Sequence, residues 1–357
     1  MNRASVVVGE KGRQRSIAIA RRGWLVLLPL IALGSCGEGH KQQQAPSISV
    51  VTSGAGEGAQ GGDEQLPGGP EGGAGRVMPK APCNGWPQLC ERPYDSITYP
   101  VAHAAMADSA SFWTYPAEDT DLRSQLDASI RGLMLEVHAK GGIPTLCFND
   151  CAEGQAPLIP ELARVAGFLD DNPREVVTLL IDNRVPASDV AQSFKDAKLA
   201  RYLYLEEPGG EWPTLGEMID QGERIVVFLA DAAGAPRGYR SLWDNVRATT
   251  DSARTARELS CDTPSGNADA PLVLLLQTLV EPVTGSEGEA GTGGAPSASV
   301  GRPSAELAAT VNRDPFFSER MAFCKSAFGQ EPTFVAVDFY DESDVIGITQ
   351  RASGLSP

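Results

Sequence analysis

An acid and a histidine stand two residues apart in the segment 131–151, which reads RGLMLEVHAKGGIPTLCFNDC. The segment predicts two short strands around a Gly-Gly turn. Side chains alternate along a strand, so Glu136 and His138 share a face with Met134 near the carboxyl end of the first strand. A carboxylate beside an imidazole is suited to proton transfer, and α/β barrels build their sites at strand carboxyl ends. The alternative explanation is a surface hairpin that carries a solvated acid.

Three further predicted strands also end in polar side chains. These are His103 after 96–102, Asp182 after 176–181 and Asp338 after 333–337. In a barrel of parallel strands, all these ends meet at one mouth. Three acids gathered there would repel each other and raise one another's pKa values unless a cation lies between them. We therefore expect a metal ion or a positively charged part of the substrate in the mouth.

Predicted strands and helices alternate along the folded part of the chain. The helices are expected near 122–130, 158–169, 188–202 and 214–222, and the remaining strands at 224–229 and 272–276. Such alternation is typical of a parallel α/β sheet, and we expect a single (β/α)₈ TIM-type barrel over residues 83–350. A doubly wound sheet is the alternative, although no G-x-G-x-x-G turn follows the first strand.

The N-terminal segment indicates export. Arg21-Arg22 precede an apolar run, 24–33, that is too short to span a bilayer and fits the core of a signal peptide. The following Leu-Gly-Ser-Cys resembles a bacterial lipobox, which implies cleavage after residue 35 and lipid on Cys36. We therefore expect a lipid-anchored protein of the cell envelope. A plain secretory signal, which would release the protein, is the alternative.

Composition separates two segments from the folded domain. Residues 36–82 and 281–304 are rich in Gly, Pro, Glu and other small or polar residues, and they hold few large apolar side chains. They are predicted to be a disordered tether and a flexible insertion. The formal net charge of −16 argues against nucleic acid as a partner, because phosphate binding needs basic patches. We expect a monomer.

Six of the seven cysteines lie beyond Cys36. An even number in an exported chain suggests disulfides, for which six cysteines allow fifteen connectivities. The most economical pairing is Cys83 with Cys90, Cys147 with Cys151, and Cys261 with Cys324. A zinc site at the C-x-x-x-C motif is the rival interpretation, but no histidine or second cysteine pair lies close to it in the sequence.

Several motifs, in this order, resemble the phosphatidylinositol-specific phospholipase C-like phosphodiesterases, the X-domain family, in their secreted bacterial branch. They are CNGWPQLCERPYDSITYPVAHAAM, QLDASIRGLMLEVH with LCFNDC, NPREVVTLLIDN, WPTLGEMI and FVAVDFY, and they extend over roughly residues 83–350. The resemblance implies a (β/α) barrel that cleaves a phosphodiester, with a phospholipid or a glycerophosphodiester as substrate.

The resemblance also implies roles for particular residues. His103 matches the histidine that takes a proton from the nucleophilic hydroxyl, and Asp338 matches the carboxylate that orients it. Glu136 and Asp182 match positions that hold a metal, Ca²⁺, in the calcium-dependent members. Either calcium or a basic side chain would offset the charge on the phosphoryl oxygens.

Two departures from the family pattern bear on activity. Ala104 stands where calcium-dependent members have an asparagine ligand, and Phe148 stands where a second histidine protonates the leaving oxygen. Phenylalanine cannot transfer a proton, and one general acid is typically worth about 10²–10⁴-fold in rate. His138 is the one remaining histidine of the folded part that could substitute, and Asp150 is a second candidate. The sequence therefore supports either a weak phosphodiesterase or an inactive protein that binds lipid or polyol phosphate.

Overall fold

The computed structural model describes residues 81–205, 210–282 and 301–356. The predicted signal peptide 1–35, the acylation site Cys36 and all but the last two residues of the tether 36–82 lie outside these ranges. Every helix within the described ranges is too short or too polar to cross a bilayer.

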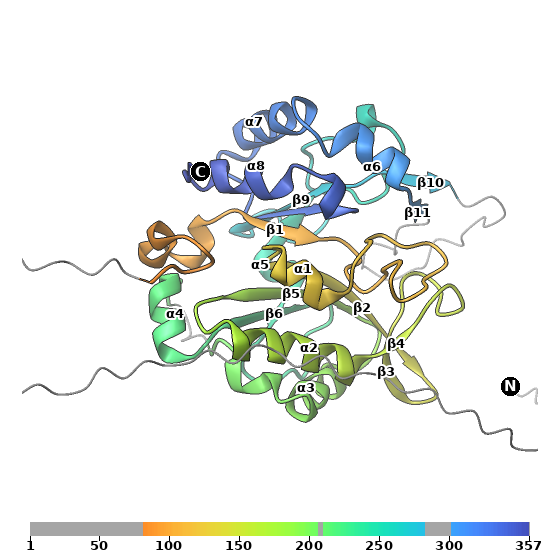
Figure 1. Ribbon diagram of the computed structural model, residues 1–357, viewed down its shortest axis with the longest axis vertical. Helices are drawn as coiled ribbons and strands as arrows, with labels where there is room; N and C mark the ends of the chain where they lie inside the picture. The colour runs from red at the N-terminus through yellow and green to blue at the C-terminus, as the bar shows by residue number, and fades with distance from the viewer. Residues whose placement is uncertain (1–80, 206–209, 283–300, 357) are drawn as a thin grey trace, which may run out of the picture. The chain divides into compact units, whose positions relative to one another are not determined.

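Eight parallel strands form the central sheet of the described residues. They are β1 (Tyr99–Ala102), β2 (Gly132–Lys140), β5 (Val177–Asn183), β6 (Ile225–Leu229), β7 (Tyr239–Ser241), β8 (Val246–Ala248), β9 (Leu272–Gln277) and β12 (Phe334–Val337). They are hydrogen-bonded in the order β7-β6-β5-β2-β1-β12-β9-β8, so the first strand lies beside the last (Figure 1). A sheet that curls round in chain order is the arrangement of a TIM-type barrel, and the predicted fold is confirmed.

The ladder has one opening. β7 and β8 are the two ends of the hydrogen-bonded order, and within the described residues they are joined only through the four-residue helix α5 (Leu242–Asn245). Both strands have three residues. The barrel is therefore complete in strand number and order, with an open seam on the side where these short strands lie.

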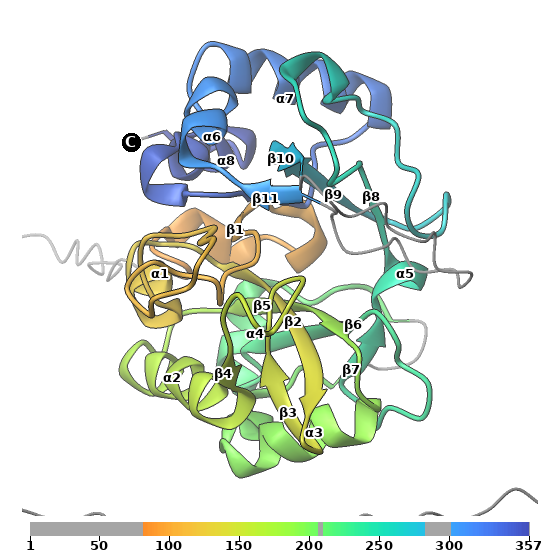
Figure 2. The same cartoon turned by 90° about the vertical axis from the view of Figure 1, so that its right-hand side faces the viewer.

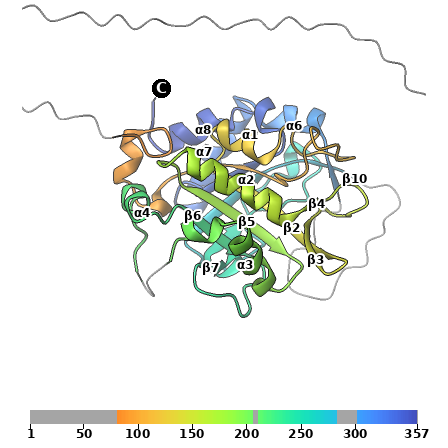
Figure 3. The same cartoon turned by 60° about the horizontal axis from the view of Figure 1, so that its bottom comes forward.

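Helices cover the outer face of the sheet (Figures 1 and 3). They are α1 (Leu122–Asp127), α2 (Leu158–Asp171), α3 (Ala187–Asp196), α4 (Leu215–Gln221), α6 (Ala305–Val311), α7 (Phe316–Phe328) and α8 (Val345–Ala352). The 3₁₀ turns are η1 (Pro87–Glu91), η2 (Tyr94–Ser96), η3 (Leu199–Tyr202), η4 (Ala256–Glu258) and η5 (Tyr340–Glu342). The predicted helix 188–202 is divided, because Lys198 adopts a left-handed conformation between α3 and η3.

The strands separate two apolar layers, as β6 illustrates. Ile225, Val227 and Leu229 pack in the cluster that includes α2 and α3, whereas Val226 and Phe228 pack in the cluster that fills the barrel interior. All five residues are buried. Burial of both faces explains why this strand is a continuous apolar run, as parallel strands generally are. The mouth of the barrel is thus fixed by a rigid frame of buried strands.

Shorter strands extend this frame. β3 (Ile143–Leu146) pairs antiparallel with β2 and confirms the predicted hairpin, and it also pairs with β4 (Ala156–Pro157). β10 (Val280–Pro282) and β11 (Gly301–Pro303) pair antiparallel (Figure 2). The ends of the predicted flexible insertion 281–304 are therefore strands, a correction that follows from their backbone pairing. Residues 283–300 lie outside the described ranges.

The three predicted disulfides are present among the described residues. Their Cα–Cα separations are 5.1 Å for Cys83–Cys90, 4.9 Å for Cys147–Cys151 and 5.2 Å for Cys261–Cys324. The Cys147–Cys151 pair closes the loop that follows β3 and carries Phe148. The rival zinc interpretation is excluded, because both of these sulfurs are bonded to each other.

Loop length predicts unequal contributions of the disulfides to stability. Cys261–Cys324 spans 63 residues and Cys83–Cys90 spans 7. By chain entropy alone, the first stabilises the fold by about 4 kcal/mol and the second by about 2 kcal/mol. Denaturant unfolding of the paired serine variants should show the larger loss for Cys261→Ser/Cys324→Ser. An equal or reversed order of the two losses would contradict this explanation.

Candidate active site

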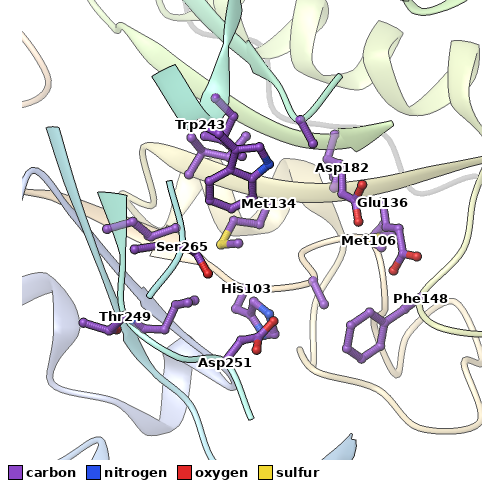
Figure 4. Close-up of a pocket in the computed structure, with 18 residues that line it drawn as sticks. His103, Met106, Met134, Glu136, Phe148, Asp182, Trp243, Thr249, Asp251 and Ser265 are labelled. Carbon is purple, nitrogen blue, oxygen red and sulfur yellow. The ribbon is translucent and has the colours of Figure 1, made fainter. Parts of the chain in front are cut away.

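A cavity of about 110 Å³ opens at the carboxyl ends of the strands (Figure 4). Its polar lining comes from several elements: His103, Glu136, Asp182, Thr249, Asp251 and Ser265. Its apolar lining includes Met106, Met134, Phe148 and Trp243. A cavity of this size holds on the order of ten water molecules, since one water needs about 10–15 Å³ by the same measure. A small head group fits in it.

A histidine–carboxylate pair stands at the junction of the first and last strands. Ala102 of β1 lies opposite Val337 of β12, which brings the next residues, His103 and Asp338, together. His103 Nδ1 is 2.8 Å from Asp338 Oδ1, and the two residues are 6% and 1% exposed. The predicted contact is confirmed. Nε2 of His103, the other ring nitrogen, has no hydrogen-bond partner within the described part of the chain.

The charge of Asp338 controls the protonation of His103. Burial lowers the pKa of His103, but the charge and hydrogen bond of Asp338 outweigh it, with smaller contributions from Asp251 and Glu136, and the pKa is raised. A carboxylate at Nδ1 directs the free lone pair of the neutral ring to Nε2 and stabilises the imidazolium. His103 is therefore built to take a proton from a group in the cavity.

A second buried acid, Glu118, lies next to the backbone that follows Asp338 and helps to fix it by hydrogen bonds. Its Oε2 accepts the backbone N–H of Tyr340 at 3.0 Å, and the carbonyl of Ala117 accepts the N–H of Phe339 at 2.7 Å. Oε1 of Glu118 and Oδ2 of Asp338 are both buried and have no partner among the described residues. Burial raises the pKa of Glu118 well above its usual range, and the Tyr340 hydrogen bond opposes this only in part. A protonated Glu118 accounts for its complete burial.

A protonated Glu118 predicts a characteristic dependence of stability on pH. Its pKa is higher in the folded chain than in the unfolded chain, so native stability falls as pH rises from about 4.5 toward the raised value. Glu118→Gln keeps the shape and replaces the O–H donor of the protonated carboxyl with an N–H donor, but it does not titrate. Its stability relative to the native protein should therefore rise with pH, as measured by thermal unfolding from acidic to mildly alkaline buffer. A constant difference at every pH would count against a proton on Glu118.

The two predicted metal ligands lie side by side but face a side-chain cation. The parallel register of β2 and β5 sets Glu136 opposite Asp182. Arg184 Nη2 lies 2.8 Å from Asp182 Oδ2 and 3.9 Å from Glu136 Oε1. His138 Nε2 lies 2.7 Å from Glu136 Oε1, and the backbone N–H of Asn149 donates to Oε2 at 3.2 Å. Both oxygens of Glu136 are thus already engaged.

This arrangement does not fit a calcium ion. Calcium takes six to eight oxygen ligands, whereas Arg184 already bonds to one of the two acids and Ala104 has no ligand atom in its side chain. Across 81–205, 210–282 and 301–356, no group of three or more His, Cys, Asp or Glu side chains is arranged to hold a metal. The third acid that lines the cavity is Asp251. Asp338 does not line the cavity, so the three acids expected in the mouth are present with Asp251 in place of Asp338.

The candidates for the missing proton donor are not brought to the cavity. His138 bonds to Glu136 and does not line the cavity, and Asp150 is exposed. His138 stays out of the cavity because of a local contact. Glu136 and His138 are two residues apart on one strand face, so their side chains can bond to each other instead of to a ligand. The sequence placed His138 on the correct face, but the contact with Glu136 determines where its ring lies.

Phe148 lines the cavity, as expected, and packs against His103. The ring centroids are 6.0 Å apart with an interplanar angle of 89°, an edge-to-face contact. No phosphate-sized gap lies between these two rings, because they touch. The open volume extends instead toward Met134, Trp243 and Asp251, which line the same cavity (Figure 4).

Asp251 and Trp243 are lining residues that sequence reasoning missed. Trp243 lies in α5, and Asp251 follows β8 by three residues. Burial raises the pKa of Asp251, and the nearby His103 opposes this rise. Strands of three residues leave too little periodicity to be recognised. The polar run Thr249-Thr250-Asp251 is a weak signal, because the segment before it, 238–248, is itself rich in polar residues.

Comparisons with known proteins agree with the fold. Residues 89–270 match the family model described as PI-PLC X 1. PI-PLC X domain-containing protein 1 of the fungus Arthroderma benhamiae is 28% identical over 291 residues, which cover 76% of this chain and 90% of the relative. An uncharacterized secreted protein of the same fungus is 27% identical over 299 residues, or 77% of this chain and 64% of the relative.

A solved structure is also similar. It comes from work on membrane binding of the phosphatidylinositol-specific phospholipase C of S. aureus. It is 13% identical, covers 75% of this chain and 95% of its own, and gives a TM-score of 0.50. At this identity the likeness supports the fold alone.

Proposed function

The chain belongs to the PI-PLC X domain family, and on that premise we propose that it is a phosphoric diester hydrolase of low activity. Its substrate would be a phospholipid head group or a glycerophosphodiester. The observation that carries the proposal is the buried His103–Asp338 pair, in which Nε2 of His103 faces the cavity with no partner among the described residues. A buried imidazole oriented by a carboxylate is the arrangement that general base catalysis needs.

The reaction starts with a proton transfer. Nε2 of His103 takes the proton of a hydroxyl, either of the substrate or of water, while that oxygen forms a bond to phosphorus. Asp338 stabilises the resulting imidazolium through Nδ1. The bond from phosphorus to the alcohol oxygen breaks, and this oxygen needs a proton. Phe148 cannot supply it, so solvent or the imidazolium itself must, and the step is slow.

In this proposal, Arg184 is the cation that offsets the negative charge of the phosphoryl oxygens. Its guanidinium is held by Asp182 at 2.8 Å and lies 3.9 Å from Glu136, next to the cavity. A fixed guanidinium lowers the net negative charge beside the phosphoryl group without a metal ion. We therefore expect a chelator to leave turnover unchanged, although the family resemblance implies Ca²⁺ in some members.

The second candidate function is binding without turnover. The contact between Phe148 and His103 favours it, because an apolar ring occupies the place of the expected proton donor. Turnover of the purified protein on phosphatidylinositol and on glycerophosphodiesters, with calcium or with a chelator, separates the two. Slow release of a phosphate monoester or cyclic product supports the hydrolase. Binding without any product supports the inactive protein.

We also propose that the protein is exported and anchored by lipid on Cys36. The three disulfides and the relative named as secreted support export. The anchor and the assignment to a bacterial branch rest on the lipobox-like sequence. Mass spectrometry of the mature N-terminus should find an acylated Cys36. An unmodified terminus at another residue would refute the anchor and leave export open.

A further inference from the structure

The cavity combines acids and apolar side chains, and its described lining includes neither arginine nor lysine. Glu136 is engaged by His138 and Asn149, and Asp182 is paired with Arg184. Asp251 differs from both, because within the described ranges no arginine or lysine pairs with it. Among the described residues, one carboxylate in the cavity therefore lacks a permanently charged partner.

The rest of the lining is poor in hydrogen-bonding groups. Apart from His103 and the three acids, the described polar lining side chains are Thr249, Ser265 and the indole of Trp243. Met106, Met134, Phe148 and several leucines supply most of the remaining surface. A polyol head group would press many hydroxyls against these apolar atoms without partners, which is costly. The lining therefore selects against an uncharged polyol.

An alkylammonium group has the opposite properties. Its charge can face a carboxylate, its methyl and methylene groups can contact apolar side chains, and aromatic rings attract it. A phosphodiester that also carries such a group is neutral overall, so it adds no negative charge to an acidic cavity. Trp243, Met134 and Phe148 share the cavity with Asp251 (Figure 4). The cavity offers the charge and the rings together.

A second observation concerns the place of the phosphate of such a ligand. His103 is only 6% exposed, lines the cavity and leaves Nε2 without a partner among the described residues. Under the proposed function, the phosphate lies at this nitrogen. Asp251 is close enough to His103 for its charge to raise the pKa of the imidazole. The two groups can therefore contact the phosphate and the amine of one small head group.

We propose that the cavity takes a phosphodiester whose alcohol carries a positively charged amine, with the ammonium group at Asp251 and the cavity's aromatic rings. The proposal rests on the proposed function for the place of the phosphate. It goes beyond that function in naming the head-group class, a cationic amino alcohol instead of an inositol-like polyol.

Calorimetric binding of two soluble diesters to the full-length protein tests the proposal. The probes are glycerophosphocholine and glycerophosphoinositol, compared at low ionic strength. The native protein should bind the choline diester at least tenfold more tightly. Asp251→Asn, which keeps the side-chain shape, should lose most of that preference. Asp244→Asn, which removes an exposed acid beside Trp243, should keep it.

The aromatic contribution is tested separately. Trp243→Phe should keep the preference, whereas Trp243→Leu should reduce it severalfold, with thermal unfolding showing that both variants fold. Four outcomes would each overturn the proposal. They are equal affinities for the two diesters, tighter binding of the inositol diester, binding of neither diester, and an unchanged preference in Asp251→Asn. Turnover of the same probes distinguishes the two claims. A choline preference without cleavage refutes the hydrolase only, and cleavage without preference refutes the head-group assignment only.

Discussion

His103→Ala is expected to reduce diester cleavage by about 10²–10⁴-fold, the range typical of a positioned general base. His103 is buried, is bonded to Asp338 and is the one histidine that lines the cavity in the described structure. No other described group at the cavity combines an unpaired nitrogen with an orienting carboxylate. The measurement is the initial rate of head-group release by equal amounts of folded native and variant protein.

Two matched variants control this experiment. His138→Ala removes the histidine that bonds to Glu136 outside the cavity, and it should cost much less activity than His103→Ala. Asp338→Asn leaves the imidazole in place but removes the charge at Nδ1, so it should give an intermediate loss. If His138→Ala alone stopped the reaction, His138 would be the proton donor and its contact with Glu136 would have to open.

Phe148→His is expected to raise activity at least tenfold. Phe148 lines the same cavity as His103 at a ring separation of 6.0 Å, so a histidine there places a second imidazole at the reacting phosphate. One positioned general acid is typically worth about 10²–10⁴-fold. The gain should fall at or below the lower end of this range, because the native rings touch and a new imidazole must turn away from His103 to reach a leaving oxygen.

Phe148→Leu is the control for the effect of a larger cavity. It removes the aromatic ring and enlarges the cavity without adding a proton donor, so it should leave the rate close to native. The pH profile separates the two variants further, since a second titrating imidazole should narrow the active range on its alkaline side. Equal gains in Phe148→His and Phe148→Leu would show that access, and not proton transfer, limits the native protein.

The positions of the main site residues could be predicted because these residues follow the carboxyl ends of strands. Buried runs such as 225–229 and 334–337 are recognisable by composition, and parallel strands carry the residues that follow them to one mouth. His103 and Asp338 are adjacent because β1 pairs with β12, which chain order in a barrel requires. Two of the disulfides could be predicted because nearby cysteines close short loops, and this leaves Cys261 and Cys324 as the third pair.

The contacts within the mouth could not be predicted. The hydrogen bond of His138 to Glu136 depends on side-chain rotamers, and the edge-to-face packing of Phe148 depends on the loop closed by Cys147–Cys151. Glu118 has no sequence signal, because an acid next to Asp119 in a polar segment is typical of solvent-exposed chain. Its complete burial becomes visible only when the Phe339 and Tyr340 backbone is seen beside it.

The most direct test of the central claim is the rate of the double variant Phe148→His/His103→Ala beside that of Phe148→His alone. If His103 is the base and position 148 is the place of the missing acid, the gain from the new histidine should vanish when His103 is removed, with or without a chelator present. Both variants should unfold at temperatures close to that of the native protein. A gain that persists without His103 would contradict the account, because the new imidazole would then be acting independently of the His103–Asp338 pair.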